Sequence, residues 1–341
     1  MKYRKLLFIT QKIDQKDDDL AFVILWIKEF IKQGFEVQVI CLQKGPFDDS
    51  FPVFSLGKEN GVGKFRRLWK FIRLITSLEY ETVFVHMNPE YFTYGGWYWI
   101  LKRIPTYLWY THYKMHIHLR LAGWISKRMF AATPQSLPQY DGNPKKIVTG
   151  HGIDVNFWES IISAAAEDHR ISETDLLMVH RICRSKRLEI GIKALEYLPA
   201  EYNLTVYGRD VEKDYYKEMK DLVRSEHLES RVKFAGPVPM PELRAIYPKY
   251  RLMVNMAYET IDKTMLEAML FGIYPVTTKA NSIAIGLTTY PENDDPETVA
   301  GFIREGEWQV YDRYRLHSIV EQNHSLRSLI GKMKQYISQG L

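Results

Sequence analysis

The chain has 341 residues, of which 46% are hydrophobic and 13% aromatic. This composition excludes a disordered or fibrous protein, and the length suffices for two domains of ordinary size. The formal charge of +5 is small and the basic residues form no long stripe, so nucleic acid is not an expected partner. Only Cys41 and Cys183 are cysteines, which gives no disulfide framework and fits a reducing cytoplasm.

The first half of the chain predicts a β/α domain. Basic residues precede the first apolar run, but that run is too short for a signal peptide and is better interpreted as a buried strand. A helix should follow, capped by acidic residues that include Asp17 and closed by Gly34. The strands are expected over 6–10, 36–42, 82–86 and 107–110, and the helix over 20–33.

Residues 58–78 combine basic and aromatic side chains at helical spacing. Two interpretations remain open for this predicted amphipathic helix. It either packs its apolar face on the domain while its charges meet water, or lies on an anionic membrane surface. Its basic residues are Lys64, Arg66, Arg67, Lys70 and Arg73.

Histidines close two of the predicted strands in this half. His112 follows one of them and is a candidate for ligand contact. His86 ends another and is better interpreted as a packed or surface side chain, with a place in the same cleft as the alternative. A zinc site formed by His112, His116 and His118 is not expected. Their spacings require a helix for the first pair and a strand for the second, so the three side chains cannot easily converge.

A basic turn opens the second half. The apolar run 176–180 predicts a strand, and Arg181 and Lys186 follow it before a helix that extends to about residue 195. Cations at the carboxyl end of a strand and close to a helix N-terminus suit an anionic ligand. Arg184 and Arg187 in the same turn fit a solvated face equally well.

Two glutamates, Glu259 and Glu267, lie eight positions apart farther along the chain. Asp262 or Thr260 can cap a helix that begins near Lys263 and ends at the next glycine. On one helix the two carboxylates would stand about 12 Å apart, too far to share a proton. They should therefore act separately, on either side of a diphosphate held at the helix N-terminus.

These segments, in this order, resemble retaining glycosyltransferases of the GT-B fold, in the family numbered 4, also called glycosyl transferases group 1. The linker 150–157 is similar to the one that joins the family's two domains. The resemblance implies an α/β protein with two Rossmann-like β/α/β domains that face each other across a cleft. Residues 1–150 would bind the acceptor and 151–324 the nucleotide-sugar donor, with a last helix, about 325–341, packing back on the first domain.

The resemblance also assigns roles. Arg181 and Lys186 would hold the donor diphosphate, Glu259 would contact the donor sugar, and Glu267 would bind the ribose. The expected catalytic residues are His112, Arg181, Lys186 and Glu259. The expected donor-binding residues are Arg181, Lys186, Glu259, Thr260, Lys263, Thr264 and Glu267.

The implied reaction moves a sugar from a nucleotide-diphosphate donor to an acceptor hydroxyl with retention of configuration, in glycan, glycolipid or polysaccharide synthesis. No cofactor and no metal would be required, because cations and a helix start stabilise the leaving diphosphate. As an alternative, Asp17, Asp18 and Asp19 would bind a cation as the Asp-x-Asp motif of the unrelated GT-A fold does. The acceptor would be a sugar or a lipid-linked sugar, and the place the cytoplasm or the inner face of a membrane contacted through residues 58–78.

Several positions depart from the family's pattern. His180 replaces the glycine that usually precedes Arg181, and Thr260, Ile261 and Asp262 replace a small residue, an aromatic residue and a glycine. An aspartate cap would occupy helix N–H groups that glycine leaves to the ligand. Two alternatives therefore stay open: a glycosyltransferase-like domain that binds without catalysis, and a GT-B nucleotide-sugar epimerase.

Overall fold

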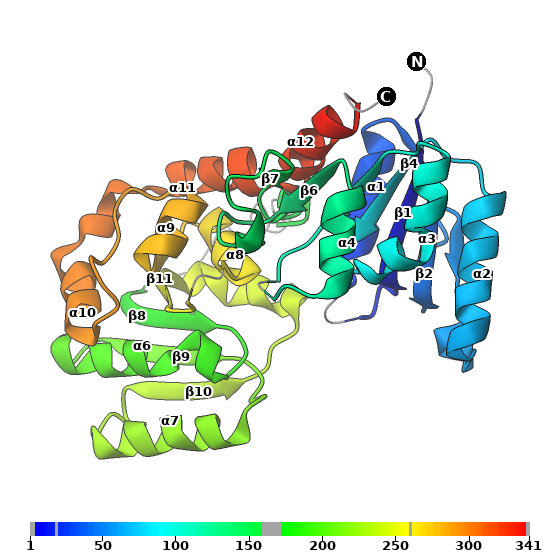
Figure 1. The fold of residues 1–341 in the computed structure, drawn as a ribbon. Coiled ribbons are helices and arrows are strands. Elements are labelled where there is room, and N and C mark those ends of the chain that lie inside the picture. The colour runs from blue at the N-terminus through cyan, green and yellow to red at the C-terminus, as the bar shows by residue number, and fades with distance from the viewer. Residues whose placement is uncertain (1–3, 18–19, 113, 159–171, 259–260, 339–341) are drawn as a thin grey trace. The chain divides into compact units, whose positions relative to one another are not determined.

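A computed structural model describes residues 4–17, 20–112, 114–158, 172–258 and 261–338 (Figure 1). The chain forms two compact units. The first comprises Met1–Gly152 together with Leu326–Leu341, and the second comprises Ile153–Ser325. Each unit is built on its own parallel β-sheet.

The first unit contains a seven-stranded parallel sheet in the order β3-β2-β1-β4-β5-β6-β7. Its strands are β1 Arg4–Ile13, β2 Phe35–Lys44, β3 Val53–Ser55, β4 Thr82–His86, β5 Thr106–Trp109, β6 Arg128–Ala131 and β7 Lys146–Val148. Its helices are α1 Phe22–Lys32, α2 Lys64–Ser77, α3 Glu90–Leu101, α4 Ile117–Ile125 and α12 Leu326–Ser338.

Side chains that alternate along β1 point to opposite faces of this sheet and build two cores. Leu6 and Phe8 join a core to which α1 and α12 contribute, whereas Leu7 and Ile9 join a core covered by α2, α3 and α4. The helix α12 is separated from the rest of this unit by the whole second unit in sequence, yet packs against α1.

The second unit contains a five-stranded parallel sheet in the order β10-β9-β8-β11-β12. Its strands are β8 Ser172–Val179, β9 Asn203–Tyr207, β10 Val232–Gly236, β11 Tyr250–Asn255 and β12 Tyr274–Thr277. Its helices are α6 Leu188–Ala194, α7 Lys213–Ser225, α8 Lys263–Leu270, α9 Lys279–Ile285, α10 Pro296–Glu305 and α11 Arg313–Ile319. One hydrophobic core runs through the unit.

Both sheets reverse their strand order next to their first strand. The reversal lies between β1 and β4 in the first unit and between β8 and β11 in the second. In open α/β sheets, ligands bind outside the carboxyl ends of the strands at such a switch point. The residues that follow these four strands therefore lie where such sheets bind ligands.

Local details of the first unit differ from the sequence-based expectations. Tyr110 lies outside β5, and the first helix begins at Phe22 rather than at residue 20. Asp17 does not cap that helix: its carboxylate accepts a hydrogen bond from Leu20 N at 2.8 Å and pairs with Lys12 at 2.6 Å. Asp17 thus stabilises the turn before the helix, because its carboxylate binds Lys12 and an N–H group of the turn instead of the helix backbone.

Two expectations concern membranes and metals. None of the helices in the described residues is long and apolar enough to cross a membrane. Across the same residues, no group of three or more His, Cys, Asp or Glu side chains could hold a metal ion. Asp18 and Asp19 of the alternative Asp-x-Asp motif lie outside the described residues.

Candidate functional site

The switch point of the second unit holds a buried ion pair. Lys186 ends a short 3-10 turn after β8, and its Nζ lies 2.5 Å from Oδ1 of Asp262, the residue before α8. The two side chains are 8% and 18% exposed, so water screens their attraction weakly. The cation predicted to hold an anion therefore already faces a carboxylate.

Asp262 is held from a second side by the end of β11. Asn255 Nδ2 donates to Asp262 Oδ2 at 2.8 Å, while Asn255 Oδ1 accepts from Ala257 N at 3.1 Å. Burial alone would raise the pKa of the Asp262 carboxyl. The charges of Lys186 and His180 and the hydrogen bonds from Asn255 and Lys186 outweigh it, so the pKa lies below its ordinary value.

The prediction that Asp262 caps the helix with its side chain is wrong. Asp262 stands at the N-cap position of α8, but its carboxylate accepts no hydrogen bond from the helix backbone. Lys186 and Asn255 compete successfully for the two carboxylate oxygens. As a result, the side chain leaves the first N–H groups of α8 to other acceptors, as an anion-binding helix start requires.

His180 lies beside this pair. Its side chain is 7% exposed, and Nδ1 lies 3.2 Å from the carbonyl oxygen of Arg181. Burial lowers the pKa of the His180 imidazole and the charge of Lys186 lowers it further, while Asp262 acts in the opposite direction. Nε2 is buried and has no hydrogen-bond partner among the residues that the structure describes.

Gly208 allows the backbone after β8 to lie close to the backbone after β9. A Cβ atom at this position would stand 1.8 Å from the carbonyl oxygen of His180, which no side chain tolerates. His180 N in turn donates to Tyr207 O at 3.1 Å. The glycine therefore fixes where His180 and the turn that carries Lys186 leave the sheet.

Glu267 points from the second turn of α8 into the interior. It is 6% exposed and accepts a hydrogen bond from the Tyr247 hydroxyl at 3.5 Å. Burial raises the pKa of the Glu267 carboxyl to about 7, against the opposing effects of Lys263 and Tyr247. Burial likewise lowers the pKa of Lys263, one turn earlier, to about 8.

The other predicted residues fall in different places. Thr264 Oγ1 donates to Val179 O at 2.8 Å and so ties the start of α8 to the end of β8. Arg181 is exposed at the end of β8, next to His180. Glu259 and Thr260 lie outside the described residues. His112 belongs to the first unit, where it is exposed after β5 with its ring 5.4 Å from that of Tyr110.

The second unit matches a known family of enzymes. Residues 163–285 match the family model described as glycosyl transferases group 1. The matched residues lie within the second unit. A search of curated proteins finds no match.

Solved structures show the same fold over nearly the whole chain. HepE (Alr3699) of Anabaena, solved with UDP and glucose, is 18% identical with a TM-score of 0.69, covering 98% of this chain and 100% of its own. A glycosyltransferase of Rickettsia africae is 12% identical with a TM-score of 0.74, covering 99% and 98%. The lipopolysaccharide outer core galactosyltransferase WaaB is 13% identical with a TM-score of 0.69, covering 98% and 99%. The two units together therefore form a GT-B fold.

Three residues at this switch point were not assigned a role in ligand binding from the sequence. His180 was noted only as a departure from the family's pattern, Asp262 as such a departure and as a possible helix cap, and Asn255 was not considered. The signal for Asn255 was present, since an amide that ends an apolar run at the carboxyl edge of a sheet needs a buried partner. Its partner, Asp262, is seven residues away and could not be inferred without the fold.

The switch point of the first unit is filled by aromatic rings. His86 is 1% exposed, its Nδ1 lies 3.3 Å from Thr10 Oγ1, and its ring stacks on Trp109 at 5.2 Å. The edges of Trp26 and Phe22 close around it. The structure thus confirms the interpretation of His86 as a packed side chain.

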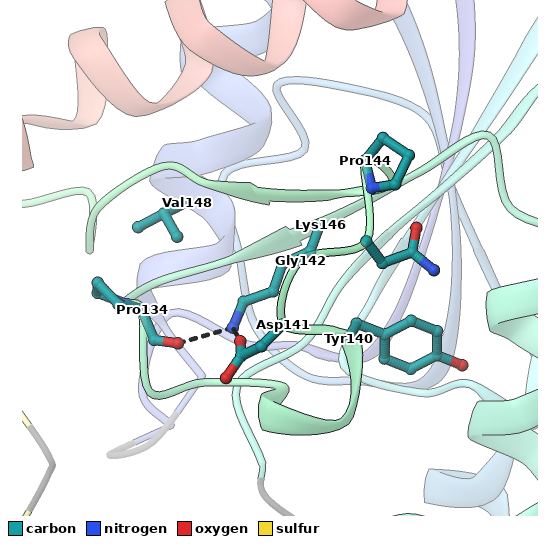
Figure 2. A pocket seen from close by; sticks show the side chains of 8 residues that line it. Pro134, Tyr140, Asp141, Gly142, Pro144, Lys146 and Val148 are labelled. Carbon is teal, nitrogen blue, oxygen red and sulfur yellow. Dashed lines mark hydrogen bonds and ion pairs between the residues drawn. The ribbon is translucent and has the colours of Figure 1, made fainter.

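A shallow depression of about 380 Å³ lies elsewhere in the first unit, around the loop before β7 (Figure 2). The ammonium group of Lys146 donates there to the carbonyl oxygen of Pro134 at 2.6 Å and also pairs with Asp141. The depression contains none of the predicted site residues, and its cation is already engaged. For these reasons the depression is not the candidate site.

Proposed function

We propose that this protein transfers a sugar from a nucleotide-diphosphate donor to an acceptor hydroxyl with retention of configuration. The observation that carries the proposal is the buried cation at the switch point of a group 1 glycosyltransferase domain, next to the N-terminus of α8. The cation and the helix N-terminus both stabilise the negative charge that grows on a leaving diphosphate.

Each of the predicted site residues has a role in this proposal. Lys186 and the exposed Arg181 bind the diphosphate, with the helix N–H groups as further donors. Glu267, one turn into α8, accepts hydrogen bonds from the ribose hydroxyls. Glu259 and His112 contact the donor sugar, and Thr260, Lys263 and Thr264 complete the donor site. These charges neutralise the diphosphate without a metal ion, so chelators should leave turnover unchanged.

A uridine nucleotide is the donor that the comparisons favour. HepE of Anabaena was solved with UDP and with UDP-glucose, and it shares this fold. The decisive measurement is thermal unfolding with the diphosphates of uridine, guanosine and adenosine and with their sugars. We expect UDP and one UDP-sugar to raise the melting temperature, whereas no shift with any of them would contradict the proposal.

Stereochemistry and acceptor need a second assay. The anomeric proton of the product, followed by NMR, should show the configuration of the donor. Conversion of the donor without an acceptor would indicate the epimerase alternative. Binding without any conversion would indicate a domain that has lost catalysis.

We further propose that the first unit contacts an anionic membrane through α2. Phe71 and Ile75 pack α2 on the unit, but Phe65 and Trp69 are 90% and 66% exposed. The two exposed rings are one helical turn apart, among exposed basic side chains, which is the pattern of an interfacial helix. WaaB, which shares the fold, is a lipopolysaccharide galactosyltransferase, and this supports a lipid-linked acceptor.

The neighbouring helices extend this surface. Trp97 and Leu101 of α3 are 53% and 71% exposed, and Trp124 of α4 is 71% exposed. Since α3 packs between α2 and α4, these side chains belong to the same helical layer. Sedimentation with vesicles that contain phosphatidylserine should carry the protein down. Phe65→Ser with Trp69→Ser should abolish this, and Tyr314→Ser, at an 84% exposed position of α11, should not.

A further inference from the structure

The Lys186–Asp262 pair stands where the proposed function needs a cation free to bind a diphosphate. Lys186 Nζ is 2.5 Å from the Asp262 carboxylate, and both side chains are largely buried. A phosphate oxygen that approaches Nζ would meet the carboxylate at the same nitrogen. Because the site is poorly solvated, two anions at that distance repel strongly. Donor and carboxylate therefore compete for Lys186.

Asp262 has a partner that remains when Lys186 leaves. Asn255 Nδ2 donates to the other carboxylate oxygen, and the orientation of this amide is fixed because Asn255 Oδ1 accepts from Ala257 N. The carboxylate would thus keep a hydrogen bond after the ion pair opens. This lowers the cost of separating a buried pair, which is otherwise high.

His180 supplies a second, independent observation at the same place. It is buried to more than nine-tenths, and the charges of both Asp262 and Lys186 act on its ring. Its Nε2 finds no hydrogen-bond partner in the described part of the chain. A buried ring nitrogen without a partner is costly, so a group that arrives or moves at this site would gain a bond with it.

We propose that Asp262 occupies the place of the donor diphosphate in the unliganded protein, and that binding of the donor transfers Lys186 from the carboxylate to the phosphates. Asp262 is then an affinity-determining residue that competes with the ligand. After sugar transfer, the carboxylate recovers Lys186 and promotes release of the nucleotide diphosphate. This inference rests on the proposed function and gives Asp262 a role in ligand binding that the sequence does not indicate.

The test uses inorganic pyrophosphate as the probe, because it needs neither the correct base nor the correct sugar. Calorimetric titration of the full chain should show that Asp262→Asn binds pyrophosphate about tenfold more tightly than the parent, which corresponds to about 1.4 kcal/mol. Uridine, which carries no phosphate, should bind both proteins equally. Equal or weaker pyrophosphate binding by the variant would overturn the proposal.

A neighbouring ion pair provides the matched control. Arg187 and Asp294 are joined at 2.6 Å, and their side chains are 26% and 29% exposed. Arg187 follows Lys186 in the sequence, and Asp294→Asn removes the carboxylate that pairs with Arg187. The Lys186–Asp262 pair is left unchanged. We expect its pyrophosphate affinity to equal that of the parent. A gain like that of Asp262→Asn would mean that general charge, rather than Asp262, sets the affinity.

Crystals of the parent protein decide the question if Asp262→Asn fails to fold. With pyrophosphate bound, Lys186 Nζ should contact a phosphate oxygen and lie beyond the salt-bridge distance of about 4 Å from Asp262. A closed pair beside bound pyrophosphate would overturn the proposal. Failure of the proposed function gives a different result, in which the pair opens on pyrophosphate but no nucleotide-sugar is converted.

Discussion

The two units have the same switch point in their sheets and fill it with opposite chemistry. In the first, His86 contacts the Thr10 hydroxyl and packs against the rings of Trp109, Trp26 and Phe22. In the second, the same topological position holds an ion pair, an amide and a buried histidine. Parallel topology places the ends of strands together, but the residues that follow the strands decide whether a ligand can enter.

The two histidines sharpen this comparison. His86 packs against aromatic rings and contacts the Thr10 hydroxyl. His180 is buried to a similar degree but lies in the field of Lys186 and Asp262. Burial alone therefore does not distinguish a packed histidine from one in a binding site, whereas the charge of its neighbours does.

The largest effect is expected from removing the cation of the second switch point. Lys186→Met takes away a group that stabilises the leaving diphosphate and leaves Asp262 buried without its counter-ion. Loss of one such preorganised donor costs about 3 kcal/mol, so turnover of the donor should fall on the order of a hundredfold. The rate of sugar transfer at saturating donor measures this.

Arg184→Met is the control for that variant. Arg184 lies in the same turn as Lys186 but pairs with Glu218 on the surface, where the side chains are 60% and 50% exposed. An exposed pair contributes little, so activity should be unchanged. Equal losses of activity in both variants would show that the whole basic turn acts together. Lys186 could then not be distinguished from the solvated Arg184.

A smaller effect concerns the pH dependence of the second unit. The Glu267 pKa is raised from 4.5 to about 7, so between these values the folded state binds a proton that the unfolded state has lost. The stabilisation that this proton provides is fully present below pH 4.5 and is lost as the pH rises through 7. Glu267→Gln removes this dependence, and its advantage over the parent should grow to about 2 kcal/mol between pH 5 and pH 8.

Urea unfolding at several pH values measures this difference. Glu305→Gln, on the exposed surface of α10, is the control and should follow the parent at every pH. If Glu267→Gln shows the same slope as the parent, the carboxyl is ionised in the folded protein. In that case Glu267 could bind the ribose hydroxyls without first releasing a proton, and UDP affinity would not rise with pH.

The sequence predicted the parts of this molecule that depend on local pattern. The apolar runs of β1, β4 and β8 and the basic turn with Lys186 were found because periodicity and strand-end position are local signals. The partner of Lys186 was not, because Asp262 is 76 residues away and suits a helix cap equally well. Which acceptor a carboxylate takes is decided by the packed fold, and the burial that raises the Glu267 pKa arises in the same way.

The smallest effect is expected in the first unit and tests whether its switch point is purely structural. His86→Phe keeps a ring between Trp109 and Trp26 but loses the contact with Thr10. One hydrogen bond contributes about 1 kcal/mol, so the free energy of unfolding should fall by that amount or less. UDP affinity should not change.

His180→Phe is the matching variant in the second unit, where a ring without nitrogen atoms replaces one that interacts with both charges of the ion pair. If UDP affinity falls in His180→Phe and not in His86→Phe, the two switch points differ in function as they do in chemistry. A similar fall in both would mean that the aromatic cluster of the first unit also supports the donor site.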